Sequence, residues 1–174
     1  MRILFLDIDG VLNSHRTILT TGNCAHPHNY EQRREMFDWT AIKMLQGLCR
    51  AGDIKVVLSS SWRCGMDRAA LDKFAAFLGL PIIDLTPNAW QPHQRRGHEI
   101  KAWLDNHAEA THYAIVDDDC DMLPEQRPYF VQTYYEDGLT FAPFSKLCDI
   151  FEVNVWDCGE RAAQREEARS KQPA

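Results

Sequence analysis

The sequence predicts an α/β protein with an open, parallel central sheet. Short and almost continuous apolar runs alternate along the chain with segments whose apolar residues recur at helical spacing. The apolar runs do not alternate apolar with polar residues, which is typical of strands buried on both faces. A length of 174 residues is enough for one domain with a substantial core.

The first third of the chain is predicted to contain a strand, an insert and a helix. Residues 2–7 (RILFLD) form an apolar run that ends in an acid, which is the pattern of a buried strand. Residues 14–37 have no periodicity and contain turn formers, so we expect a loop or small cap there. Asp38 is a candidate N-cap for a helix that ends near Gly52. Four apolar residues of that helix share one face: Trp39, Ile42, Leu45 and Leu48.

Strands and helices continue to alternate over the rest of the chain, which favours right-handed β-α-β units. Gly79 marks the end of a helix, and the Asp137-Gly138 pair marks a turn. Residues 157–174 mix charged and small residues, and we expect them to form a tail outside a single domain of residues 1–156. The predicted strands are residues 54–58, 81–85, 113–116 and 129–133, and the predicted helices are residues 67–78, 98–106 and about 143–151.

The composition argues against several classes of protein. Hydrophobic residues make up 45% and charged residues 25% of the chain, which is typical of a folded globular domain. With 19 Lys and Arg against 25 Asp and Glu, the formal net charge is −6, which argues against broad binding to nucleic-acid backbones or anionic membranes. No apolar run approaches the roughly 20 residues that span a bilayer, and the N-terminus lacks the pattern of a secretory signal. We therefore expect a cytoplasmic protein without a membrane partner, and its six dispersed cysteines as free thiols.

Polar side chains directly follow three of the predicted strands. Asp7 and Asp9 follow the first strand, Ser59 opens a run of three serines after the second, and residues 117–119 are an acid triplet after the fourth. The carboxyl ends of parallel strands meet at one edge of the sheet, so these groups should converge. Crowded carboxylates repel one another, and oxygen ligands without a neighbouring set of His or Cys favour Mg²⁺. The sequence therefore predicts a magnesium site at this edge.

The same residues suit phosphoryl transfer. An aspartate at a strand end, such as Asp7, can attack phosphorus and form an aspartyl-phosphate. A second carboxylate two residues on, Asp9, can protonate the leaving oxygen and later activate water. A hydroxyl and a cation, here Ser59 and Lys101, are suited to holding the phosphoryl oxygens.

The order of these residues resembles that of the haloacid dehalogenase (HAD) superfamily over roughly residues 1–150. The motif DIDGVLN at residues 7–13 is the most specific part, followed by Ser59, Lys101 and the acid triplet. The SSSWR, GHEIKAWL and VDDDCDM runs are similar to the small HAD domain found alone or in bacterial RNA-repair proteins. The resemblance implies a Rossmannoid three-layer fold with a minimal cap, and a phosphatase acting on a nucleotide or nucleic-acid end.

The resemblance also implies a role for each residue of the motifs. Asp7 would be the nucleophile and Asp9 the general acid and base, and Ser59 and Lys101 would bind the phosphate. Mg²⁺ would be held by Asp7, the Asp9 carbonyl and Asp118, with Asp117 behind them, although a shift of one residue would exchange the last two. We expect three further residues to contact the substrate: Asn13, Ser60 and Arg63.

Several assignments stay open at this stage. Ser60 or Ser61 could replace Ser59, and Arg95 or Arg96 could replace Lys101 as the phosphate ligand. Two further alternatives concern a zinc site and aromatic residues that stack a base, each weighed against a role in the core or on the surface. The zinc candidates are Cys24, His26 and His28, and the stacking candidates are Trp62 and Trp90.

The substrate is not determined by the sequence. The inserts at residues 14–37 and 86–97 are too short for a cap domain, so we expect an open site. An open site admits a polymer end, a mononucleotide or a small sugar phosphate. A catalytically idle HAD-like scaffold or binding module is the alternative to an enzyme.

Overall fold

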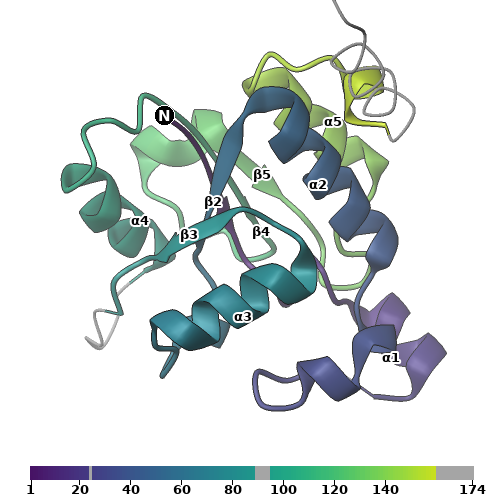
Figure 1. Ribbon diagram of the computed structural model, residues 1–174. Coiled ribbons are helices and arrows are strands. Elements are labelled where there is room, and N and C mark those ends of the chain that lie inside the picture. The colour runs from purple at the N-terminus through teal and green to yellow at the C-terminus, as the bar shows by residue number, and fades with distance from the viewer. Residues whose placement is uncertain (24, 89–94, 160–174) are drawn as a thin grey trace, which may run out of the picture.

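The computed structural model describes residues 1–23, 25–88 and 95–159 (Figure 1). Trp90, Cys24 and most of the predicted tail lie outside the described residues. The strands are β1 (Arg2–Leu6), β2 (Ile54–Leu58), β3 (Ile82–Leu85), β4 (His112–Asp117) and β5 (Phe130–Gln132). The α-helices are α1 (His15–Thr21), α2 (Trp39–Gly52), α3 (Arg68–Leu78), α4 (Arg96–Asp105) and α5 (Phe141–Ile150).

The strands form one sheet in the order β3-β2-β1-β4-β5, and every pair is parallel. The chain builds outward from β1 through β2 to β3 and then returns to the other side of β1 for β4 and β5. The point where the strand order reverses therefore lies between β1 and β4. In open α/β sheets, ligands bind at the carboxyl ends of the strands at such a point. This architecture confirms the predicted α/β fold with a parallel Rossmannoid sheet.

Helices cover both faces of the sheet. Alternate residues of each buried strand point to opposite faces, so Leu4 and Leu6 pack in one core and Ile3 and Phe5 in another. The first core contains side chains from α2, α3 and α5. The second contains Ile100 and Trp103 of α4. Figure 1 shows α4 on one side of the sheet and α2 and α5 on the other.

Three elements differ from the sequence prediction. The insert at residues 14–37 is not only a loop, because it contains α1 and two short 3-10 helices, η1 (Tyr30–Gln32) and η2 (Arg34–Met36). The last helix begins at Phe141 and so places Pro143 in its first turn, where the missing N–H of proline costs no helical hydrogen bond. Helix α4 begins at Arg96, two residues earlier than predicted, so Arg96 lies in the first turn of the helix. Among the described residues, no helix is long and apolar enough to cross a membrane.

Candidate active site

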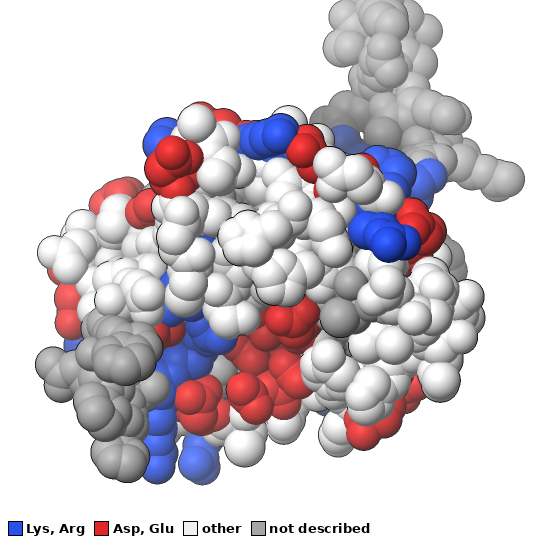
Figure 2. Space-filling model, turned by 90° about the horizontal axis from the view of Figure 1, so that it is seen from below, with Lys and Arg blue, Asp and Glu red and all other residues white. Residues whose placement is uncertain are grey.

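Three aspartates meet at the carboxyl edge of the sheet, where the strand order reverses. Asp7 follows β1 and its N–H donates to the Val116 carbonyl at 3.1 Å, so it lies level with Asp117 at the end of β4. Carboxylate oxygens of Asp7, Asp117 and Asp118 all lie within 4.8 Å of one another. We call these three residues the acid cluster. In the view onto this edge, Figure 2 shows acidic side chains gathered near the middle of the face with basic side chains beside them.

Gly10 allows Asp118 to approach the loop that follows β1. Its φ of +70° lies in the left-handed region, which glycine adopts without strain. A Cβ at position 10 would come within 2.4 Å of the Asp118 Cγ. The Gly10 backbone carbonyl accepts a hydrogen bond from the Thr133 hydroxyl at 2.8 Å. The glycine of the first motif is therefore required by the close packing of two site loops.

The acid cluster is electrostatically costly without a counter-charge. Burial raises the pKa of Asp7 to about 6, against an opposing hydrogen bond from Ser60. Burial, with added repulsion from Asp7, raises the pKa of Asp117 to about 8. Burial also raises the pKa of Asp118. The Asp117 Oδ2 is buried and accepts no hydrogen bond.

This donor set fits a hard divalent cation. Mg²⁺ prefers oxygen ligands, and a bound cation would neutralise several carboxylates and interact with the Asp117 Oδ2, which accepts no hydrogen bond. In the described residues, the acid cluster is the one group of three or more His, Cys, Asp or Glu close enough to hold a metal ion. His26 and His28 lie near each other, with ring centroids 5.1 Å apart, but do not form such a group. The zinc alternative thus has no support in the part of the chain that is described.

The raised pKa values predict how the stability of the metal-free protein depends on pH. The folded state keeps protons on Asp7 and Asp117 up to about pH 6 and 8, whereas the unfolded chain releases them near the ordinary pKa of 3.8. The folded state binds more protons over this range, so the free energy of unfolding should fall as pH rises from about 4 to about 8. Thermal melts in a chelator across this range measure the effect.

Mg²⁺ should reverse this loss of stability at neutral pH. At a concentration 100 times its Kd, a ligand that binds only the folded state stabilises it by about 2.7 kcal/mol. For a domain of this size, that corresponds to a rise in Tm of about 5 to 11 °C. An unchanged Tm at pH 7.5 with saturating Mg²⁺ would contradict a metal site in the acid cluster.

Asp9 is held by two neutral donors. Its Oδ1 accepts from the Asn13 amide at 2.8 Å, and its Oδ2 accepts from the Trp62 indole N–H at 3.0 Å. Trp62 is buried and packs on Phe74 and other aromatic rings, so it belongs to the core and is not available to stack a base. Asn13 was expected to contact the substrate, but its amide points to Asp9, and both donors orient the Asp9 carboxyl.

The three serines after β2 have different surroundings. Ser59 follows β2 level with Asp7, and its hydroxyl is buried without a hydrogen-bond partner. The Ser60 hydroxyl contacts the Asp7 carboxylate and accepts from the Trp62 backbone N–H. Ser61 is exposed and lines a neighbouring cavity. Ser60 thus lies near enough to Asp7 to lower its pKa, and the Ser59 hydroxyl has no hydrogen-bond partner among the described residues.

The cation beside the acid cluster is Arg96, not Lys101. The Arg96 Nε lies 3.4 Å from the Asp117 Oδ2, and its charge lowers the pKa of both Asp7 and Asp117 against the larger effect of burial. Lys101 lies more than one helical turn further along α4, has a half-exposed side chain, and pairs with Asp105 at 2.8 Å. The structure therefore places Arg96, the alternative phosphate ligand, beside the acid cluster and places Lys101 in a separate ion pair with Asp105.

Arg63 also differs from expectation. Its guanidinium is buried, donates to the backbone carbonyls of Thr86 and Ser60, and pairs with Glu99 at 2.6 Å. A guanidinium with this many protein partners has little capacity left for a substrate. Arg63 thus ties the loops after β2 and β3 together.

Comparison with known proteins agrees with this geometry. Residues 3–143 match the family described as the HAD domain in Swiss Army Knife RNA repair proteins. The chain belongs to this HAD family. No curated protein and no solved structure matches the chain. The family assignment made from the sequence motifs is therefore confirmed, and it extends over most of the described residues.

Two polar residues of this HAD domain were missed in the sequence. Glu99 pairs with both Arg63 and Arg96. Thr133 connects Asp117 to the Gly10 loop, because its backbone N–H donates to the Asp117 carbonyl at 3.0 Å and its hydroxyl donates to the Gly10 carbonyl at 2.8 Å. Glu99 lies in a helix of mixed polarity, where a glutamate is ordinarily exposed, so no local signal marks it. Thr133 is the last residue of the strand predicted at residues 129–133 and directly follows β5, so the strand-end rule that revealed the aspartates could have found it.

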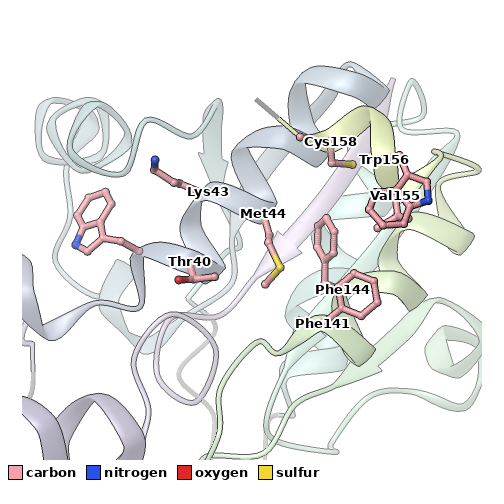
Figure 3. Close-up of a pocket in the computed structure, with 10 residues that line it drawn as sticks. Thr40, Lys43, Met44, Phe141, Phe144, Val155, Trp156 and Cys158 are labelled. Carbon is pink, nitrogen blue, oxygen red and sulfur yellow. The ribbon is translucent and has the colours of Figure 1, made fainter. Parts of the chain in front are cut away.

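The HAD domain also has a larger cavity that is unrelated to the acid cluster. This cavity of about 660 Å³ lies between α2, α5 and the 3-10 helix η5 (Val155–Cys158), and apolar side chains such as Met44, Phe144 and Trp156 line it (Figure 3). A smaller polar cavity of about 230 Å³ lies beside Arg96 and Ser61 at the carboxyl edge. The residues that line this smaller cavity include Arg96 and Glu99 but no member of the acid cluster.

Replacing Arg96 and Lys101 separately with Gln tests which of these two cations of α4 acts on the substrate. Arg96→Gln should lower kcat/KM for an aryl phosphate by about 10- to 1000-fold, because an electrostatic partner of the reacting group is lost. Lys101→Gln should stay within about twofold of the wild type, because the Lys101 ion pair is exposed. Steady-state kinetics of both variants decide the assignment, and a loss confined to Lys101→Gln would reverse it.

Proposed function

We propose that this HAD domain is a Mg²⁺-dependent phosphomonoester hydrolase that works through an aspartyl-phosphate on Asp7. The observation that carries the proposal is the meeting of the acid cluster with Ser60 and Arg96 at the reversal point of a parallel sheet. Nucleophile, counter-charge and hydroxyl thus share one small volume. Membership of the HAD family supports a hydrolase of the phosphatase type.

The metal would be held by carboxylates of the acid cluster. Asp7, Asp117 and Asp118 supply the oxygens, and the half-buried Asp118 faces the opening while Asp117 lies deeper. A bound Mg²⁺ supplies positive charge that offsets the negative charge of a phosphate near these carboxylates. The same positive charge would lower the raised pKa of Asp7 and so favour its carboxylate form.

In the first step, an Asp7 carboxylate oxygen attacks phosphorus and the bond from phosphorus to the ester oxygen breaks. The leaving oxygen takes a proton from Asp9, whose carboxyl is oriented by Asn13 and Trp62. Arg96 lies beside the cluster, where it can stabilise charge on the phosphoryl oxygens. The unpaired Ser59 hydroxyl is a further donor for the same oxygens.

In the second step, water attacks the phosphorus of the aspartyl-phosphate and Asp9 takes its proton. The bond from phosphorus to the Asp7 oxygen breaks, which releases phosphate and restores the Asp7 carboxylate. Asp9 thereby regains the proton that it gave to the leaving group, and phosphate ester and water are converted to alcohol and phosphate.

We propose a nucleotide or a nucleic-acid end as the substrate. The family is described from RNA repair proteins, and the rim of the site carries exposed aromatic side chains. Tyr134 is 69% exposed and directly follows Thr133, which contacts Gly10 and Asp117. The His15 and Tyr135 rings pack edge to face 4.7 Å apart on the same rim. Aromatic rings at such a position are suited to stacking a base next to a terminal phosphate.

A panel of phosphomonoesters tests the proposal. Wild-type protein with Mg²⁺ should release phosphate from oligonucleotides with a 3′- or 5′-phosphate or from mononucleotides, and a chelator should abolish the release. Hydrolysis confined to sugar phosphates would overturn the nucleotide proposal but keep the phosphatase. No hydrolysis of any ester, combined with tight binding to an oligonucleotide, would instead identify an idle HAD-like scaffold.

A further inference from the structure

A chain of alternating charges leads away from the acid cluster. Asp117 faces Arg96 at 3.4 Å, Arg96 faces Glu99 at 3.4 Å, and Glu99 faces Arg63 at 2.6 Å. Arg63 then ends on the backbone carbonyls of Ser60 and Thr86. This charge chain connects the end of β4, the first turn of α4 and the loops after β2 and β3.

Glu99 is the central member of the charge chain. Its side chain is only 11% exposed, and its Oε2 is shared by Arg63 and Arg96. The two guanidinium groups repel each other, and the charge of Arg96 therefore lowers the pKa of Arg63. The Glu99 carboxylate acts in the opposite direction and raises the pKa of Arg63. Without the Glu99 carboxylate, two buried or nearly buried cations would face one another, and the more exposed Arg96 is the one free to move away.

Arg96 depends on Glu99 for its orientation. Its backbone is fixed because its N–H donates to the Asp121 carboxylate at 2.8 Å. Within the part of the chain that is described, its side chain is held by ion pairs with Asp117 and Glu99. When Asp117 interacts with a cation, its attraction for Arg96 is weakened. Glu99 is then the main restraint on the guanidinium in the charge chain.

We propose that Glu99 is a positioning residue that holds the Arg96 guanidinium at the acid cluster, where Arg96 meets the phosphoryl group. This inference rests on the proposed function, because the group that Arg96 meets is the phosphate ester. Glu99 itself contacts neither the acid cluster nor the reacting atoms, and it acts through Arg96. A purely structural Glu99 would only neutralise Arg63.

A double-mutant cycle separates these two roles. Glu99→Gln keeps the size of the side chain and removes its charge. It should lower kcat for an aryl phosphate about 10- to 100-fold with a change in KM of no more than about threefold. In an Arg96→Gln background, the same substitution should change kcat by less than about twofold, since the residue it positions is gone. An equal loss of kcat in both backgrounds, or no loss in the wild-type background, would overturn the proposal.

The control lies on the same helix. Asp105→Asn breaks the exposed ion pair with Lys101 in α4 and should leave kcat and KM unchanged. Thermal melts report whether Glu99→Gln is folded, because it leaves the buried Arg63 without its counter-charge.

If Glu99→Gln does not fold, Glu99→Asp replaces it in the cycle. That variant keeps a carboxylate to neutralise Arg63. Its side chain is one methylene shorter, which should weaken the contact to Arg96 most, because the Glu99–Arg96 distance of 3.4 Å is already longer than the Glu99–Arg63 distance of 2.6 Å. Folded Glu99→Asp with wild-type kcat would contradict the proposal. A wild-type protein without phosphatase activity would overturn the proposed function and this inference together, whereas an active wild type with unaffected Glu99 variants would overturn this inference alone.

Discussion

Replacing Asp7 with Asn should lower kcat/KM for an aryl phosphate by at least about 10⁴-fold, while the protein stays folded. The amide cannot form the aspartyl-phosphate, and it removes one of the three carboxylates of the acid cluster. Because burial disfavours the Asp7 carboxylate, the metal-free variant should be at least as stable as the wild type at pH 7.5. Steady-state kinetics and thermal melts of the same preparation measure both effects.

A matched carboxylate elsewhere controls for the loss of charge. Asp149 is exposed in the last turn of α5, and Asp149→Asn should keep wild-type kinetics. The Mg²⁺-dependent rise in Tm should shrink in Asp7→Asn and persist in Asp149→Asn. Wild-type turnover by a clean preparation of Asp7→Asn would show that another group is the nucleophile.

Asp9→Asn should lower kcat by about 10²- to 10⁴-fold, because the second step loses its general base. The effect on the first step should depend on the leaving group of the ester. Nitrophenolate leaves without protonation, so an aryl phosphate should give a rapid burst of about one product per protein followed by slow turnover. An alkyl phosphate needs a proton on its leaving oxygen, so its burst should be absent. Rapid-quench kinetics with the two esters check this difference.

The surroundings of Asp9 provide a graded comparison. Asn13→Ala removes one of the two donors that orient the Asp9 carboxyl and leaves the carboxyl itself in place. We expect a smaller loss of kcat than in Asp9→Asn, and no accumulation of phosphorylated protein. Equal bursts for aryl and alkyl esters in Asp9→Asn would remove Asp9 from the acid role.

The acid cluster could be predicted from sequence because it depends on local signals and one topological rule. Buried strands at residues 2–7 and 113–116 were recognisable from their apolar runs, and the acids directly follow them. Parallel strands bring their carboxyl ends to one edge, so Asp7 and Asp117 had to meet if the strands were adjacent.

The position of Arg96 beside the acid cluster could not be predicted from the sequence, because the start of α4 depends on a distant residue. Arg95 offers no side-chain cap, and the helix begins at Arg96 because the Asp121 carboxylate accepts its N–H. That capping contact spans 25 residues, so the local sequence pattern does not reveal it. The earlier start puts Arg96 in the first turn at the sheet edge and moves Lys101 away from it.

Arg63 and Glu99 could not be assigned for a related reason. A charged residue is ordinarily exposed, and its burial is decided by a partner that the fold supplies from another element. Arg63 lies in the 3-10 helix η3 (Ser61–Arg63) and meets Glu99 only because α4 packs beside the loops after β2 and β3. This buried ion pair connects α4 to the loops after β2 and β3.

The central claim is that Asp7 carries the phosphoryl group during turnover, and one measurement tests it most directly. Asp9→Asn protein is mixed with an aryl phosphate and Mg²⁺, quenched in acid within the burst, and its peptides are fragmented in a mass spectrometer. The account predicts one added phosphoryl group on residues 3–16, located at Asp7, and none in the Asp7→Asn/Asp9→Asn double variant. A burst of product without a phosphorylated peptide, or with the phosphoryl group on another residue, would contradict it.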